Sequence, residues 1–251
     1  MLNTPVNGLF LLFFTLFWLN SAFAACDDAA APKVNWANCD LSGKDFKNKD
    51  LSDSILTGAD LSNADFSHAT LENVDFNFAK LEGTRFDGSK MTNSRLVAVK
   101  ATAASFRGVN LENSRLSRAV LINADFSEAR AGRANFYEAN LKSASFINAK
   151  LTKTNFEHTD LTRAKFDGAS LDRAMLSNAR LYESSFVGAN ANKAVFDDSD
   201  CRLADFTKAN LSKASFRQAD IEESIFTDAV LRDTIWVDYK RCRASSIGGC
   251  L

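Results

Sequence analysis

The sequence predicts an all-β fold in which the chain winds into a four-sided solenoid of about ten coils. Three observations predict it. A large apolar residue recurs at every fifth position from Leu41 to Trp236, without an insertion or deletion and with few small exceptions. A small residue, most often alanine, lies two positions before it. Leucine and phenylalanine alternate at the large position, and one register of twenty residues contains only phenylalanine.

The period of five residues fits neither a helix nor a straight strand. A step of five advances a helix by about 500°, which carries the apolar positions around the whole cylinder. In an extended chain the small and large residues share a face, but the next small residue follows three positions later and would face the other way. The chain must therefore bend in every unit. Glycine and asparagine, which tolerate the positive φ of corners, are frequent two positions after the large residue, as at Gly43 and Asn63.

The register of twenty residues predicts four sides per coil. With four sides each wall stacks its own residue type, whereas three sides would alternate leucine and phenylalanine up every wall. The expected core aromatic stack consists of Phe46, Phe66, Phe86, Phe106, Phe126, Phe146, Phe166, Phe186, Phe206 and Phe226. Coils spaced about 4.8 Å apart would form a rod roughly 50 Å long.

The repeat is similar to that of the pentapeptide-repeat family, whose shared motif is a small residue, Asp or Asn, Leu or Phe, and two variable residues. The segment ADLSNADFSHATLENVDF, residues 59–76, carries this motif plainly. The resemblance covers about 200 of the 251 residues. It implies the family fold, a right-handed quadrilateral β-helix; the handedness comes from the resemblance alone.

We expect four segments along the chain: a signal peptide at 1–24, an N-terminal cap segment at 25–38, the pentapeptide-repeat β-helix at 39–238 and a tail at 239–251. Residues 9–19 are apolar and uncharged, and they are too few to span a bilayer of about 30 Å. Residues 22–24, Ala-Phe-Ala, match a signal-peptidase site. Because no Lys or Arg precedes the apolar run, an uncleaved anchor is the alternative. Residues 23–26 also resemble a lipobox, so a lipid anchor at Cys26 stays open.

Five cysteines are present. Cys201 occupies a large position of the repeat, so we expect a buried, inert thiol there. Cys242 and Cys250 flank a short segment of the tail, and a disulfide between them would contribute about 2.5 kcal/mol on the chain-entropy model. The tail also resembles the Cys-closed ends of exported bacterial pentapeptide-repeat proteins. Cys26 and Cys39 are the other expected pair, unless lipidation consumes Cys26.

The sequence predicts no catalytic, cofactor-binding or metal-binding residues. His68 and His158 lie 90 residues apart, four and a half coils, and so on opposite faces. No Cys-x-x-Cys, Gly-rich phosphate loop or Gly-x-Ser-x-Gly motif occurs. Asp200 and Asp220 would stack as neighbouring carboxylates, but a convex, wet wall gives no desolvation to shift their pKa values. A weak cation site on such a row is the minor alternative.

Charge and surface pattern favour a binding protein. The net charge is -1, made up of -3 for residues 1–100, +4 for 101–180 and -2 for 181–251, which suits neither a nucleic-acid binder nor a strongly acidic DNA mimic. We therefore expect a non-enzymatic scaffold or protein-protein interaction surface, exported to the periplasm or outside a bacterial cell. Its protein partner is unknown, and we expect no nucleic acid and no membrane span after signal removal.

Two alternative functions stay open. Family likeness suggests a DNA mimic that protects or inhibits a topoisomerase, and an enzyme of unknown type on the solenoid wall is the other. Some outward residues towards the C-terminal end are apolar, and we expect them on several different faces. They leave open a homodimer through that end, and they are Met175, Val195, Ile225, Val230, Ile235 and Val237.

Overall fold

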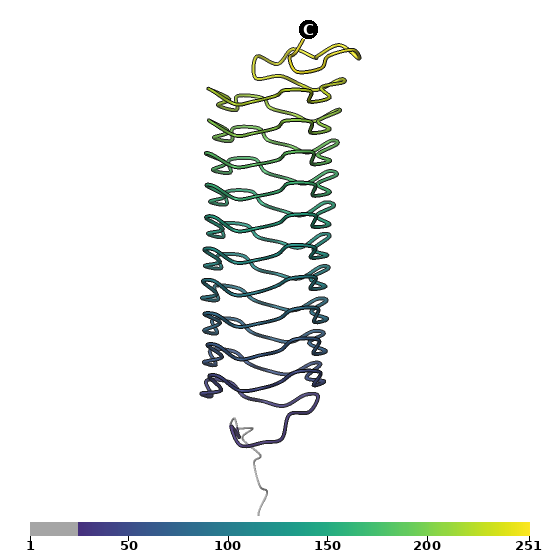
Figure 1. Ribbon diagram of the computed structural model, residues 1–251. Helices are drawn as coiled ribbons and strands as arrows, with labels where there is room; N and C mark the ends of the chain where they lie inside the picture. Colours follow the sequence, from purple (N-terminus) through teal and green to yellow (C-terminus); the bar gives the residue numbers. More distant parts are fainter. Residues whose placement is uncertain (1–24) are drawn as a thin grey trace, which may run out of the picture.

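The computed structural model describes residues 25–251; the predicted signal peptide, 1–24, lies outside the described residues. The described chain contains no helix, and its β-structure consists of isolated bridges rather than strands of several residues. The coils pile up along one axis, from the N-terminal cap in purple to the tail in yellow (Figure 1). Each wall of the solenoid thus contributes single bridged residues to its ladder.

Every parallel bridge joins a residue to the residue twenty positions later. Val120 pairs with Asn140, Asp125 with Ser145, and the next two units along the chain follow the same rule. One ladder runs in these steps from Asn35 to Ile235. Because the bridged positions recur every five residues, each coil has four sides, as the register of phenylalanines predicts.

Hydrogen bonds hold each coil to both of its neighbours. In the unit that begins at Leu121, the amide of Leu121 donates to the carbonyl of Asn140 at 2.7 Å. The amide of Asp125 donates in the other direction, to the carbonyl of Ala104 at 3.1 Å. Each unit therefore depends on coils above and below it, and an isolated coil has no partner for its backbone.

The corners are left-handed throughout the repeats. Asn123 has a φ of 58°, and the same conformation occurs at Phe78, where φ is 61° although neither glycine nor asparagine is present. An Asp or Asn side chain often closes the turn: the Asp125 Oδ1 accepts a hydrogen bond from the Ser127 amide at 2.9 Å. This local bond explains why the repeat favours Asp or Asn just before the large residue.

The interior is filled by columns of large side chains with the small residues at the inner corners. Ala124 and Phe126 are both almost completely buried. Where serine or threonine replaces the alanine, its hydroxyl can bond to a coil below, as Thr84 Oγ1 does to the Leu61 carbonyl at 2.8 Å. Lys44 and Lys49, the exceptions at the small position, lie exposed near the N-terminal end.

The ten phenylalanines form one continuous stack. Successive ring centroids lie between 4.6 Å and 5.3 Å apart, and successive ring planes differ by 2° to 20°. Phenylalanines of the other mixed column meet this stack edge-on, as Phe136 meets Phe126 at 5.6 Å. Tryptophans pack at both ends: Trp36 lies 5.2 Å from Phe46, and Trp236 lies 5.1 Å from Phe226.

Candidate functional site

The walls of the rod are covered by ladders of charged side chains. Lys80 Nζ lies 3.0 Å from an oxygen of Asp60, and Arg95 lies 2.7 Å from an oxygen of Asp75. Both pairs join neighbouring coils, one residue above the other. Because these pairs are largely exposed, each contributes little to stability, about 0–1 kcal/mol.

An arginine forms ion pairs with both of the stacked carboxylates, Asp200 and Asp220. Arg202 Nε lies 2.8 Å from Asp200 Oδ1 and 3.4 Å from Asp220 Oδ2. Hydrogen bonds from the Arg202 guanidinium hold the pKa of Asp200 below its ordinary value, against the opposing effect of partial burial. A general acid needs the opposite shift. The sequence reasoning paired the two aspartates but missed the arginine two positions further on.

The two histidines lie apart, at corners of different rows. The ring of His68 covers Gly88, where an added Cβ would meet its Nδ1 at 2.7 Å. His158 packs edge-on against Tyr137 with ring centroids 5.4 Å apart. Residues 25–251 contain no group of three or more His, Cys, Asp or Glu side chains arranged to hold a metal ion.

Cys201 lies in the core column. Its side chain is completely buried, and the Ser199 Oγ lies 3.1 Å from its Sγ. Burial raises the pKa of the Cys201 thiol to about 12. The thiol is therefore protonated and unreactive at neutral pH.

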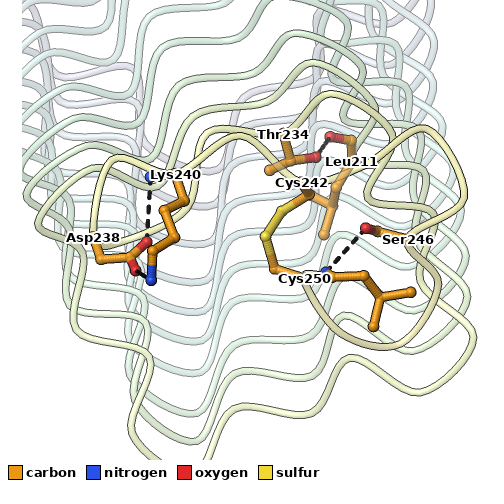
Figure 2. The surroundings of a disulfide bond; sticks show 8 residues. Leu211, Thr234, Asp238, Lys240, Cys242, Ser246 and Cys250 are labelled. Atoms are coloured by element: carbon orange, nitrogen blue, oxygen red, sulfur yellow. Dashed lines mark hydrogen bonds and ion pairs between the residues drawn. A yellow bond between two sulfur atoms is a disulfide. The ribbon is translucent and has the colours of Figure 1, made fainter.

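The tail folds back over part of the last coil and is closed by the Cys242–Cys250 disulfide, whose Cα atoms are 4.8 Å apart. Its direction reverses, because Val230 pairs with Ile247 and Ile235 with Arg241 in antiparallel bridges. Figure 2 shows the disulfide beside Thr234, whose Oγ1 donates to the Leu211 carbonyl at 2.7 Å.

The tail leaves part of the last coil uncovered. One coil earlier, the amides of Cys201 and Phe206 donate to the carbonyls of Asp220 and Ile225, at 2.8 Å and 2.7 Å. Within residues 221–228 of the last coil, four amides lack the bond to a next coil that their counterparts twenty positions earlier make: Ile221, Glu223, Phe226 and Asp228. We call residues 221–228 the open edge. Ile225 is 48% exposed there.

The N-terminal end is closed differently. The Cys26–Cys39 disulfide, with Cα atoms 5.5 Å apart, ties the cap segment to the first coil. Cap residues 26–28 and Ala30 line a hollow of about 220 Å³ together with Trp36, Leu41 and Phe46. The cap therefore shields the beginning of the aromatic stack.

The apolar surface residues named from the sequence lie on several rows of the rod, and three of them share one row. Met175, Val195 and Ile235 belong to a single row, because the bridges link 175 to 195, 195 to 215 and 215 to 235. Ile225 and Val230 lie in two other ladders, so the six residues do occupy several faces, as expected. Sequence reasoning also missed Phe78, which is 63% exposed at a corner.

A row of basic residues was missed as well. At the corner that follows the large residues 131, 151, 171, 191 and 211, five successive coils carry a cation. Its signal in the sequence was a cation at every twentieth residue from 133 to 213. A hollow of about 350 Å³ lies on another row and is lined mainly by polar residues such as His158 and Arg180.

These features define a solenoid of stacked five-residue units without a helix. A family model for the pentapeptide repeat region matches residues 31–106, 79–156, 99–176 and 131–194. A second, for pentapeptide repeats in eight copies, matches residues 184–222 and 199–235. The chain belongs to the pentapeptide-repeat family.

The solved structure of HetL agrees on the fold. HetL, a pentapeptide repeat protein involved in heterocyst differentiation regulation in the cyanobacterium Nostoc sp. strain PCC 7120, is 25% identical, with a TM-score of 0.56. The match covers 84% of this chain and 92% of HetL. QnrB1, a plasmid-mediated fluoroquinolone resistance protein, is 19% identical, with coverage of 76% and 92% and a TM-score of 0.46.

A third solved structure, a pentapeptide repeat protein from the thylakoid lumen of Arabidopsis thaliana, is 32% identical. The match covers 42% of this chain and 70% of the Arabidopsis protein, with a TM-score of 0.29. A comparison with curated proteins gives no match. Within residues 25–251 no helix is long and apolar enough to cross a membrane.

Proposed function

We propose that this chain is a non-enzymatic, exported scaffold that binds protein, and that its open edge binds a second copy of the chain. The observation that carries this proposal is the set of four unpaired amides in residues 221–228. We further propose the right-handed winding that the family resemblance implies and the count of about ten coils that the five-residue period from Leu41 to Trp236 implies. The ladder from Asn35 to Ile235 in steps of twenty supports that count.

The open edge is chemically suited to pair with itself. Beside its four amides, the carbonyls of Ala219 and Ser224 accept no backbone amide among the described residues, whereas the carbonyls twenty positions earlier do. An unpaired edge that carries both donors and acceptors is a template for another chain. Two such edges related by a two-fold axis form a closed dimer. Ile225 adds apolar surface at that contact.

The dimer is tested by Ile225→Lys. The matched control is Ile55→Lys, because Ile55 is 43% exposed on a wall far from the edge. Light scattering after size exclusion should give a dimer mass for the wild type and for Ile55→Lys, and a monomer mass for Ile225→Lys. A monomer for the wild type at high concentration would exclude the second copy. Crosslinking in the native compartment would then identify the heterologous protein bound instead.

The non-enzymatic assignment is supported by the state of the wall carboxylates. Asp60, Asp75 and Asp200 are each in an ion pair with a basic neighbour. An unbiased substrate screen should give no turnover above background. Turnover that disappears with Asp200→Asn would overturn this part of the proposal.

Export is supported by two disulfides, which form and persist in oxidising compartments. A fusion of residues 1–30 to a reporter that is active only outside the cytoplasm should be active. Mass spectrometry of the mature protein should find Cys26 bonded to Cys39 and the chain starting near residue 25. A lipid on Cys26 would replace that disulfide by a membrane anchor.

We favour the scaffold over the topoisomerase-protecting DNA mimic because the walls carry charges of both signs. Acidic rows contain basic partners, as at Asp60 and Lys80, and the net charge is only -1. A DNA mimic needs a continuous acidic surface that a DNA-binding protein can accept. Protection of a purified topoisomerase by the mature chain would favour the mimic.

A further inference from the structure

One corner of the rod carries five cations in a single row. Each lies twenty residues after the one before, on five successive coils, so neighbouring Cα atoms are about 4.8 Å apart. We call this row the basic column, and its members are Arg133, Lys153, Arg173, Lys193 and Lys213. All are exposed except Lys193, which is partly buried. The row begins after Asn113 and ends before Asp233.

The basic column is unfavourable for folding in two ways. Like charges in register on neighbouring coils repel each other. Each residue also adopts a left-handed conformation, with φ of 59° at Lys153 and 58° at Lys193, where glycine or asparagine costs less. The same row holds asparagine in the three coils before it, at Asn73, Asn93 and Asn113.

At two other corners a cation has an anionic partner in the next coil. Arg118 Nε lies 2.8 Å from an oxygen of Glu138 in the next coil, and Arg163 Nε lies 2.6 Å from one of Glu183. In the basic column, only Arg173 has a carboxylate within ion-pair distance in residues 25–251, that of Asp172 at 3.7 Å. The other four cations form no ion pair within residues 25–251, which leaves their charge available to an external anion.

The surface beside the basic column can bind a ligand with hydroxyl groups. Arg133 and Lys153 border a hollow of about 210 Å³ that exists because Gly132 has no side chain, and an added Cβ there would meet only the Thr152 carbonyl, at 3.6 Å. Glu112, which also lines the hollow, is neutralised by Arg130 at 3.1 Å. The adjoining row offers small polar groups, including Thr152 and Ser212.

We propose that the basic column binds an anionic polysaccharide, laid along the rod with its carboxylate or sulfate groups against successive coils. The straight, even spacing of the cations suits a linear polymer with regularly repeated charges. Double-stranded DNA, by contrast, carries one charge per about 1.7 Å of axis, far denser than one cation per coil. Anionic polysaccharides also occur outside the cytoplasm, where the two disulfides would persist. This inference goes beyond protein binding and does not depend on the open edge.

The test measures binding of the disulfide-bonded chain to heparin and to polygalacturonate, with dextran as the neutral polymer. The test variant changes all five residues of the basic column to glutamine. Its matched control removes the same charge from five exposed cations that share no row: Lys44, Lys49, Lys100, Arg115 and Lys208. Circular dichroism and thermal melting establish that both variants fold.

We expect the column variant to bind one of the two acidic polymers on the order of a hundredfold more weakly at low salt, and the control variant to lose much less. The slope of log K against log salt concentration should become shallower by roughly 3, because fewer counterions are released. If the wild type binds neither heparin nor polygalacturonate more tightly than dextran, the proposal is overturned. Equal losses in both variants would overturn the role of the basic column. Tighter binding to single-stranded DNA, or to phosphatidylglycerol-containing vesicles, would overturn the choice of polysaccharide.

Discussion

At the residue scale, Phe126 illustrates how the core is held. Its ring stacks on Phe106 at 4.6 Å and on Phe146 at 4.9 Å, and it is completely buried. Phe126→Ala removes both stacking contacts and leaves a cavity between rigid coils. We expect the free energy of unfolding to fall by about 3–5 kcal/mol, measured by chemical denaturation.

The control for that measurement is Phe78→Ala. Phe78 is 63% exposed at a left-handed corner, so its removal should change the free energy of unfolding by less than about 0.5 kcal/mol. If Phe126→Ala unfolds at the wild-type denaturant concentration, the stack does not stabilise the fold.

Cys201 gives a prediction about pH. Burial raises its pKa to about 12 in the folded chain, from a value of 9.0 for an unperturbed thiol. A raised thiol pKa means that the unfolded state loses its proton first. The stability is therefore complete below about pH 9 and decreases as pH rises from there towards 12. Labelling by iodoacetamide at pH 8 should be slow in the folded chain and fast in denaturant; rapid labelling of the folded chain would contradict a buried thiol.

The corner residues show what sequence reasoning could and could not predict. Gly43 and Asn63 indicated a positive φ from their own preferences, and both have it. Lys153 and Phe78 have no such preference, yet their φ values are 59° and 61°. Hydrogen bonds to the next coil impose the conformation there, and those bonds follow from the register of the whole solenoid.

At the element scale, the tail depends on its disulfide. Replacing both Cys242 and Cys250 by serine should cost about 2.5 kcal/mol locally. Hydrogen exchange should become faster at the amides of Leu231 and Trp236, which donate hydrogen bonds to tail carbonyls at 3.0 Å and 2.7 Å. The amide of Leu121 should exchange at the wild-type rate, because central coils are bonded on both sides. Cys201→Ala is the matched control and should leave the tail amides unchanged.

The sequence predicted the two cysteine pairs but not the path of the tail. Residues 239–251 lack the five-residue period, so nothing local indicates that Ile247 turns back against Val230. The open edge follows from that reversal and was equally hidden. The relation of Arg202 to Asp200 and Asp220 was missed for another reason. The repeat places Asp200 above Asp220 in one row, but it does not indicate that the long side chain of Arg202, two positions further on, reaches both carboxylates.

At the scale of the whole molecule, stability is a sum over neighbouring coils. Four sides of five residues close each coil, so deleting residues 111–130 removes one coil and keeps every row in register. Deleting residues 111–120 removes half a coil and shifts the phenylalanine stack to the opposite wall. We expect the first deletion to melt close to the wild type and the second at a clearly lower temperature. Equal melting temperatures would mean that the rows contribute nothing.

The antiparallel tail has a consequence for growth of the rod. A parallel ladder can be lengthened without limit, since each coil presents the same edge that it received, and such rods could join head to tail into fibres. Here the strand beyond Ile235 runs backwards, so the first coil of another molecule meets a backbone of the wrong polarity. The reversal therefore blocks head-to-tail growth, and the only association that we propose at this end is rotational, between the open edges of two molecules across a two-fold axis.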